Sequence, residues 1–272
     1  MASTSELDTA ALARRDAGDS SGEAQGTVEK AIDVLFHLSA AGSPCGVTAL
    51  GHALEMPKSS VHRLLASLTR RGLVERDDRG RYRPGVGLVA LGLGVLEREP
   101  TVVAARPVLE RFAEQVGETF FLVGARAGAL VVLEKAEGTG FLRAAPRVGS
   151  TVPVHATAVG KLYLAFAPEC LTKQPADALE SFTPLTVVHR DALERELAGV
   201  RASGLARNRD EWIRGLSVLA APVFLHERLV AAVALALPSQ ALSDHRPGEL
   251  EQSVRAAAEQ IGARLSGAAP RR

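Results

Sequence analysis

Apolar residues recur with helical spacing between residues 58 and 70. They stand at positions i, i+3, i+4 and i+7 and form one buried face: Val61, Leu64, Leu65 and Leu68. The opposite face carries short hydroxyls and long cations, namely Lys58, Ser59, Ser60, His62, Arg63, Ser67 and Arg70. Side chains of these kinds bond base edges and phosphates, so the pattern predicts a helix whose polar face suits DNA.

The segments on either side of this helix predict a winged helix-turn-helix. A short helix capped by Thr48 is expected to extend through Leu54, and residues 55–57 form the turn. After the main helix, residues 73–82 predict a hairpin that exposes Arg79 and Arg81. A recognition helix and a basic wing are the two parts with which such domains dock on DNA.

The DNA-binding domain is expected to span residues 27–85. Residues 1–26 are rich in Ala, Ser, Gly and Asp and predict a disordered tail. Thr27 is a plausible N-cap for a helix that extends to about residue 41. Its expected apolar face consists of Val28, Ile32, Leu35 and Phe36.

Residues 86–99 predict a linker helix with an apolar stripe. Val89, Leu93 and Leu96 lie on that stripe, which would be exposed unless another copy of the chain covered it. We therefore expect this helix and the first helix to form an interface between two copies.

From residue 100 onward the pattern alternates between helical and strand periodicity. Helices are expected at residues 103–116, 157–166, 193–202 and 243–265, strands at 120–125, 130–134 and 141–145, and an apolar hairpin at 217–237. Helices that flank a predominantly antiparallel sheet make an α+β fold. Residues 100–268 are therefore expected to form an α+β sensor domain.

Charge is concentrated in the predicted DNA-binding region. The 272 residues carry a formal net charge of only +1, yet residues 57–85 hold eight Lys or Arg against three Asp or Glu. A basic field inside a nearly neutral chain indicates a docking patch for nucleic acid rather than general affinity for anions.

Several kinds of chemistry find no support in the sequence. The two cysteines are far apart and the histidines are scattered, so a metal site is not expected. Residues 85–90 and 159–161 only partly match nucleotide-binding motifs, and nothing resembles a catalytic nucleophile or carboxylate pair. No cofactor and no enzymatic activity are expected. Without a signal peptide or a long apolar run, a cytoplasmic protein with no membrane partner is expected.

Five segments of the chain carry a family resemblance. They are VEKAIDVL, MPKSSVHRLLASLTRRGLVERDDRGRYRPG, ARPVLERFAEQVGET, RVGSTVPVHATAVGKLYLAF and GLSVLAAPVF. In this order and spacing the chain resembles IclR-type transcriptional regulators over nearly all of residues 27–265. The resemblance implies an N-terminal winged helix, a linker helix and a C-terminal GAF-like effector-binding domain. It also implies a homodimer, often a dimer of dimers, on a palindromic operator of double-stranded DNA.

The resemblance implies that Lys58, Ser59, Ser60, His62 and Arg63 are the recognition-helix residues that contact DNA. The polar face of the helix adds Ser67 as a candidate, and the basic hairpin adds Arg79 and Arg81. Ser59 and Ser60 could instead serve the helix N-terminus, and His62 could face solvent without touching DNA. Arg63 is harder to explain as a structural residue because no acidic partner lies four residues away.

An effector site is implied around residues 153–160, 208–215, 218 and 234–236. Family members that sense small hydroxy or keto acids carry an Asp, a Cys and two Ser at the positions that hold Asn208, Val218, Ala234 and Ala236 in this chain. Loss of these polar groups penalises a dicarboxylate, so a small organic acid with an apolar body, such as an aromatic or branched-chain acid, is expected to bind. The candidate effector-binding residues are His155, Ala158, Val159, Asn208, Arg209, Glu211, Trp212, Val218, Ala234 and Ala236.

Three of the candidates in this site, Arg209, Trp212 and His155, have an alternative role. Asn208, Arg209 and Glu211 are expected to hold the polar end of the ligand, but Arg209 could pair with an acidic neighbour. Trp212 could be ordinary packing, and His155 could cap the helix at residue 157.

The favoured function is a ligand-responsive regulator of a metabolic operon, a repressor or an activator. The alternative is a DNA-binding protein whose C-terminal domain only oligomerises.

Overall fold

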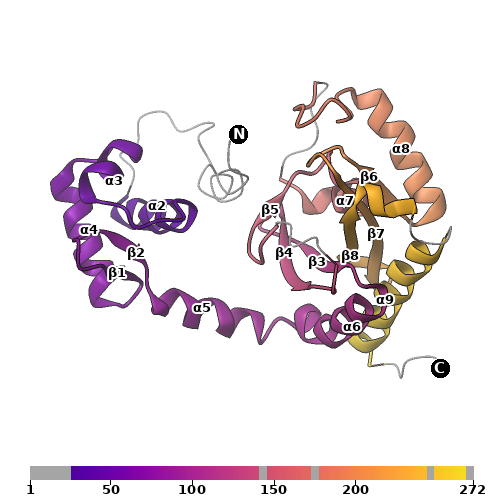
Figure 1. Ribbon diagram of the computed structural model, residues 1–272, viewed down its shortest axis with the longest axis horizontal. Coiled ribbons are helices and arrows are strands. Elements are labelled where there is room, and N and C mark those ends of the chain that lie inside the picture. Colours follow the sequence, from indigo (N-terminus) through magenta and orange to yellow (C-terminus); the bar gives the residue numbers. More distant parts are fainter. Residues whose placement is uncertain (1–25, 141–145, 173–177, 244–247, 268–272) are drawn as a thin grey trace. The chain divides into compact units, whose positions relative to one another are not determined.

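The computed structural model describes residues 26–140, 146–172, 178–243 and 248–267, and the chain divides into two compact units between Glu97 and Arg98 (Figure 1). The expected strand at 141–145 and nearly all of the expected tail at 1–26 lie outside the described residues. Each unit is considered by itself below. Among the described residues, no helix combines the length and apolar character needed to cross a membrane.

The N-terminal unit is a helix-turn-helix with a two-stranded wing. Its elements are α2 (Thr27–Ala40), α3 (Val47–Ala53), α4 (Lys58–Arg70), β1 (Val74–Arg76), β2 (Tyr82–Pro84) and α5 (Val86–Leu96). The expected stripe of α4 is buried as predicted, and it packs with residues of α2, α3 and the wing. Gly46 rather than Thr48 precedes α3, and Gly26 rather than Thr27 precedes α2, so both threonines lie inside their helices.

The apolar face expected for α2 is only partly correct. Val34 and Leu38 are the buried residues of this helix, and Ala31 and Leu35 pack against the core beside them. Val28 is 73% exposed and Ile32 is 44% exposed. The core therefore takes the i, i+3, i+4, i+7 set that begins at residue 31, and the first turns of α2 present apolar side chains outward.

The C-terminal unit is a six-stranded antiparallel sheet between two helical layers. Its strands are β3 (Thr119–Arg126), β4 (Ala129–Ala136), β5 (Thr151–Val152), β6 (Ala206–Arg209), β7 (Leu216–Leu225) and β8 (Arg228–Pro238), in the spatial order β5-β4-β3-β8-β7-β6. Its helices are α6 (Pro100–Val116), α7 (Ala158–Phe166), α8 (Arg190–Ser203) and α9 (Glu249–Leu265), with short 3-10 turns η1 (Pro168–Cys170) and η2 (Ser239–Ser243). The α+β prediction is confirmed.

The sequence explains why the sheet is covered on both faces. The central strand β3 is apolar and buried from Thr119 through Gly124, as expected for a strand between two layers. Helices α6 and α9 pack on one face, while α7 packs on the other and is covered in turn by α8 (Figure 1). Alanines on β8, including Ala234 and Ala236, place only short side chains in the core between the sheet and α7.

The start of α7 is fixed in detail because it borders the candidate site. The Thr157 hydroxyl accepts a hydrogen bond from the Gly160 N–H (3.1 Å) and donates one to the Pro153 carbonyl (2.6 Å). A Cβ at Gly160 would lie 1.7 Å from the Val154 carbonyl oxygen, so only glycine fits this approach. The helix therefore begins in one defined position relative to the preceding strand.

Candidate functional site

The polar face of α4 is exposed along most of its length. Lys58, Ser59, His62 and Arg63 are exposed, and Ser60 is half-buried. Ser67 is also exposed, but its hydroxyl accepts a hydrogen bond from the Arg70 guanidinium (3.1 Å). The four residues of α4 that are buried in the core, Val61, Leu64, Leu65 and Leu68, all belong to the other face of the helix.

The two candidate arginines of the wing, Arg79 and Arg81, differ in their side-chain contacts. Asp77 accepts hydrogen bonds from the backbone N–H of Arg79 and of Arg81, and its carboxylate pairs with the Arg81 guanidinium (3.2 Å). The Arg79 side chain is exposed and has no such partner among the described residues. The Arg81 backbone N–H, together with the guanidinium, keeps the pKa of Asp77 below its ordinary value. Arg81 therefore shapes the wing, while Arg79 remains free to meet a phosphate.

A narrow apolar cavity of about 40 Å³ lies between the sheet and α7. The predicted residues that line it are Ala158, Val159, Asn208, Trp212, Val218, Ala234 and Ala236. Strand register brings three of them together, because Asn208 pairs with Val218 and Val218 pairs with Ala236. Phe121 of β3 lines the cavity as well and pairs with Ala234, a contribution that the sequence did not reveal.

Asn208 is the most deeply buried polar side chain in this cavity, at 4% exposure. Its amide nitrogen donates to the Ala156 carbonyl oxygen. Because a carbonyl can only accept, this bond fixes which way the amide is turned. The amide oxygen has no hydrogen-bond partner among the described residues and is left as an acceptor.

The N-terminus of α7 is the second polar feature of the cavity. Ala158 and Val159 are its first two residues, and both line the cavity. The first N–H groups of an α-helix have no partner within the helix and carry a partial positive charge. The Thr157 hydroxyl satisfies the N–H of Gly160. This end of the helix can therefore receive an acceptor or an anion.

Three of the predicted effector residues lie outside the cavity lining. Arg209 follows Asn208 on strand β6, and successive side chains of a strand point to opposite faces, so Arg209 is exposed on the other side. His155 bonds the Glu180 carbonyl through Nε2 (2.8 Å) and stacks on Phe182, and it does not cap α7. The structure does not bring Arg209 or His155 together with the remaining candidates.

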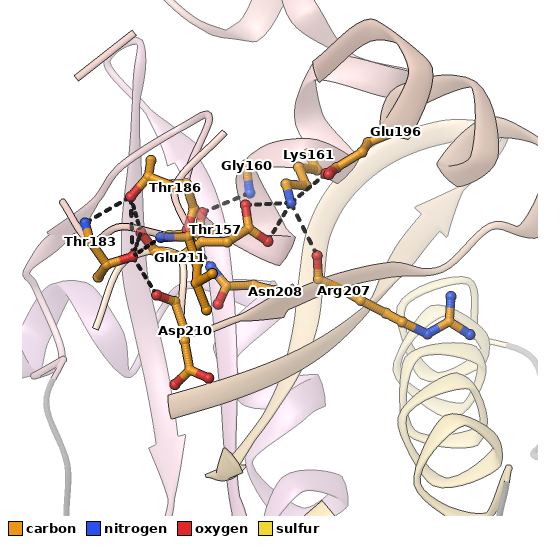
Figure 2. Close-up of polar contacts among 12 residues, drawn as sticks. Thr157, Gly160, Lys161, Thr183, Thr186, Glu196, Arg207, Asn208, Asp210 and Glu211 are labelled. Atoms are coloured by element: carbon orange, nitrogen blue, oxygen red, sulfur yellow. Dashed lines mark hydrogen bonds and ion pairs between the residues drawn. The ribbon is translucent and has the colours of Figure 1, made fainter. Parts of the chain in front are cut away.

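Glu211 is the third of these residues, and it belongs to a buried ion-pair cluster. The Lys161 ammonium, only 1% exposed, lies 2.7 Å from both carboxylate oxygens of Glu211 and 2.6 Å from the Glu196 carboxylate (Figure 2). It also donates to the Arg207 carbonyl (3.3 Å). Burial raises the pKa of Glu211, and the charge of Lys161 opposes that rise. Glu211 is thus occupied by the protein itself.

Sequence reasoning missed this cluster, although a signal was present. Lys161 stands among apolar residues in the segment that forms α7. A buried cation must be paired, so a carboxylate elsewhere in the chain was required. The pair connects α7 to the loop between β6 and β7, which carries Trp212.

The same loop is held by a second set of hydrogen bonds. Thr183 donates from its hydroxyl to the Asp210 carbonyl (2.6 Å), and Thr186 donates to the Glu211 carbonyl (Figure 2). Asp210 adopts a left-handed conformation with φ of 59°, and its N–H donates to the Leu216 carbonyl (2.9 Å). Trp212 therefore sits on a loop that is fixed on both sides of it.

No group of three or more His, Cys, Asp or Glu side chains suited to a metal ion occurs in the part of the chain that the structure describes. The arrangement in the C-terminal unit combines a small apolar cavity with one acceptor and one helix N-terminus, which are features of small-molecule sites.

Known proteins resemble this chain over most of its length. The family model for the bacterial transcriptional regulator IclR C-terminal domain matches residues 93–263, and the model for the IclR helix-turn-helix domain matches residues 27–78. The probable transcriptional regulator SauR of Cupriavidus necator is 33% identical over 77% of this chain and 84% of its own length. The regulator BhcR of Paracoccus denitrificans is 32% identical over 90% of this chain and 88% of its own.

Solved structures have the same fold. The IclR protein of Thermotoga maritima is 27% identical, with a TM-score of 0.72 over 88% of this chain and 98% of its own. An IclR homologue from Microbacterium hydrocarbonoxydans, solved in complex with 4-hydroxybenzoate, is 24% identical, with a TM-score of 0.76 over 89% of this chain and 100% of its own. These relatives are DNA-binding transcriptional regulators rather than enzymes, and the chain belongs to the IclR family.

Proposed function

We propose that this regulator binds a palindromic operator as a homodimer, or as a dimer of dimers, and that a small organic acid in the apolar cavity changes its affinity for DNA. Helix α4 would enter the major groove, with Lys58, Ser59, Ser60, His62 and Arg63 toward the bases and phosphates. Arg79 would meet the backbone from the wing. The exposure of the α4 face supports these assignments.

The surface of α5 supports an assembly of two copies. Among its residues Val89, Leu93 and Val95 are each more than half exposed, and none of the helix is buried within the chain. Val28 and Ile32 of α2 add further exposed apolar area in the same unit. Apolar surface of this extent is typical of an interface.

The proposed class of ligand follows from the composition of the cavity wall. Apart from the Asn208 amide and the start of α7, the lining consists mainly of apolar side chains such as Phe121, Val218 and Ala236. Burial of a second carboxylate against such a wall would cost several kcal/mol, on the order of 2–7 for a polar group without a partner. The ligand is therefore an acid with one charged end and an apolar body.

The two polar features assign an orientation to this ligand. The carboxylate would face the first N–H groups of α7, at Ala158 and Val159, where the helix dipole favours an anion. The Asn208 oxygen would accept from a donor on the ligand, such as a phenolic hydroxyl. This replaces the expectation that Asn208, Arg209 and Glu211 together hold the carboxylate.

Entry of such a ligand requires the cavity to widen. Apolar cavities that bind benzene are on the order of 150 Å³, several times the 40 Å³ found here. Trp212 is half-buried, and although its loop is held on both sides, its side chain can widen the cavity by changing rotamer. Its displacement would pull on the loop that Lys161 and Thr186 hold, and this offers a route from ligand binding to a change in the domain.

Isothermal titration of the full chain with four acids tests this proposal. We expect 4-hydroxybenzoate to bind more tightly than benzoate, and both to bind more tightly than glyoxylate or succinate. In Asn208→Leu the advantage of 4-hydroxybenzoate over benzoate should disappear, a loss of about 0.5–1.5 kcal/mol for one hydrogen bond. A preference for glyoxylate or succinate over both aromatic acids would overturn the ligand class.

A further inference from the structure

We propose that the C-terminal unit has a second small-molecule site, a cleft on the far side of β6 from the apolar cavity, which binds a phosphate monoester. The cleft has a volume of about 780 Å³, within the range of about 300–1,000 Å³ typical of ligand sites. Its lining comes from three segments: Thr183 to Leu185, the two ends of the β6–β7 loop (Arg209, Asp210, Arg214 and Gly215), and η2. None of these lining residues also lines the apolar cavity.

Strand geometry explains why the two sites lie back to back. Asn208 and Arg209 are neighbours on β6, and their side chains point to opposite faces. Asn208 lines the cavity and Arg209 lines the cleft. The loop that follows repeats this division, since Trp212 lines the cavity while Arg214 lines the cleft.

Two guanidinium groups make the cleft suited to an anion. Arg209 and Arg214 are both exposed, and neither side chain has a hydrogen-bond or ion-pair partner within the described ranges. Among the lining residues that the structure describes, the one carboxylate is Asp210, which accepts from the Gly215 N–H and from the Ser239 hydroxyl (2.9 Å). Its charge is therefore partly compensated by neutral donors, and the two arginines remain available for an anion.

A phosphate monoester satisfies both parts of this lining. Two guanidinium groups match a dianion with three terminal oxygens, and arginine binds phosphate in a bidentate manner. Pro184, Leu185 and Leu242 form an apolar part of the wall, and Leu185 is 60% exposed. The organic group of the ester would cover this leucine. Inorganic phosphate would use only the arginines.

Because the cleft and the cavity share the loop that carries Trp212, we expect binding at one site to affect binding at the other. A ligand that bridges Arg209 and Arg214 fixes the ends of the segment that carries Trp212. Whatever binds in the cavity moves or fixes the same residue, so occupancy of either site would change affinity at the other by the same factor. The binding proposal for the cleft itself does not depend on what the cavity binds.

Titration of the full chain with phenyl phosphate, inorganic phosphate and phenol tests the proposal. Trp212 is the one tryptophan in the sequence, so its fluorescence reports on the shared loop without labelling. We expect phenyl phosphate to bind more tightly than inorganic phosphate, and phenol to leave the cleft empty. The double variant Arg209→Gln, Arg214→Gln should weaken phenyl phosphate by about tenfold or more, because charge-assisted hydrogen bonds are lost.

Two control variants make the outcome decisive. Arg228→Gln, Arg264→Gln removes the same charge from exposed arginines outside the cleft, and it should leave the affinity within about twofold. Val218→Asp places a carboxylate in the cavity and should also leave the affinity for phenyl phosphate unchanged. Equal losses in the two double variants would show general attraction of anions, and a loss in Val218→Asp would place phenyl phosphate in the cavity. Either result, or no saturation at concentrations on the order of 10 mM, would overturn the proposal.

Discussion

The polar face of α4 and the cavity beside α7 differ in how much of the chain each of them needs. The α4 face lies within thirteen consecutive residues, and one helix decides which of them are exposed. The cavity draws its wall from β3, β5, α7, β6, β7, β8 and the loop that carries Trp212. A surface built on one helix follows from local spacing, whereas a cavity depends on register and on long-range pairs.

The largest expected effect concerns α5, which is another locally determined surface. In Leu93→Glu, Leu96→Glu the apolar stripe gains two charges, and burial of a leucine is worth about 1.5–3 kcal/mol in each copy. We expect sedimentation velocity to show dissociation to smaller species. Leu185→Glu, on an exposed leucine of the other unit, is the control. An unchanged oligomer in the α5 variant, or dissociation in the control, would move the interface elsewhere.

The next largest expected effect is a loss of stability in the C-terminal unit alone. Lys161→Met leaves Glu211 buried without its cation, which we expect to destabilise the C-terminal unit by about 3–5 kcal/mol. Urea denaturation followed by Trp212 fluorescence measures this loss. In Lys161→Met, Glu211→Leu much of the stability should return, because the pair is replaced by apolar groups.

Lys135→Met is the matched control for this prediction. Lys135 also forms an ion pair, but its partner Glu137 is half exposed (side chain 50%), and such pairs contribute about 0–1 kcal/mol. If Lys161→Met cost no more than Lys135→Met, the buried cluster would not be what holds the loop against α7.

The smallest expected effects distinguish a base contact from a phosphate contact within the DNA-binding surface. Arg63→Ala should lower the affinity for the specific operator by about 1–3 kcal/mol, with less effect on random DNA. Arg79→Ala should weaken binding to all sequences and flatten the salt dependence by about one unit. Arg83→Ala is the control, since Arg83 is already paired with Glu75 (3.1 Å). Equal effects of Arg63→Ala and Arg79→Ala on both kinds of DNA, measured by fluorescence anisotropy, would refute the division.

The same contrast explains what could be predicted from the sequence. The stripe of Val61, Leu64, Leu65 and Leu68 is buried as the spacing predicts, because helical periodicity is a local property. The α2 face was only partly correct, since two overlapping apolar stripes compete there and tertiary contacts select the one that contains Val34. The role of Arg81 in the wing could not be separated from that of Arg79, because both are equally basic in the sequence.

The cavity was harder to predict for physical reasons. Family resemblance brought Val218, Ala234 and Ala236 together, and strand register places them side by side. Arg209 and Glu211 were grouped with Asn208 because they are close in the chain, but strand alternation and the pair with Lys161 take both out of the cavity lining. No local pattern reveals which buried cation a carboxylate will meet fifty residues away.

The central claim is that an acid in the cavity controls DNA binding, and one anisotropy experiment tests it directly. A labelled DNA fragment from upstream of the protein's own gene is titrated with the full chain, with and without saturating 4-hydroxybenzoate, for wild type and for Val218→Asp. We expect the acid to change the wild-type affinity by about 5–150-fold, a coupling of roughly 1–3 kcal/mol. Val218→Asp should bind DNA as tightly as wild type and show no response, because the new carboxylate repels the ligand. An acid that binds without changing the affinity for DNA, or a full response in Val218→Asp, would contradict the account.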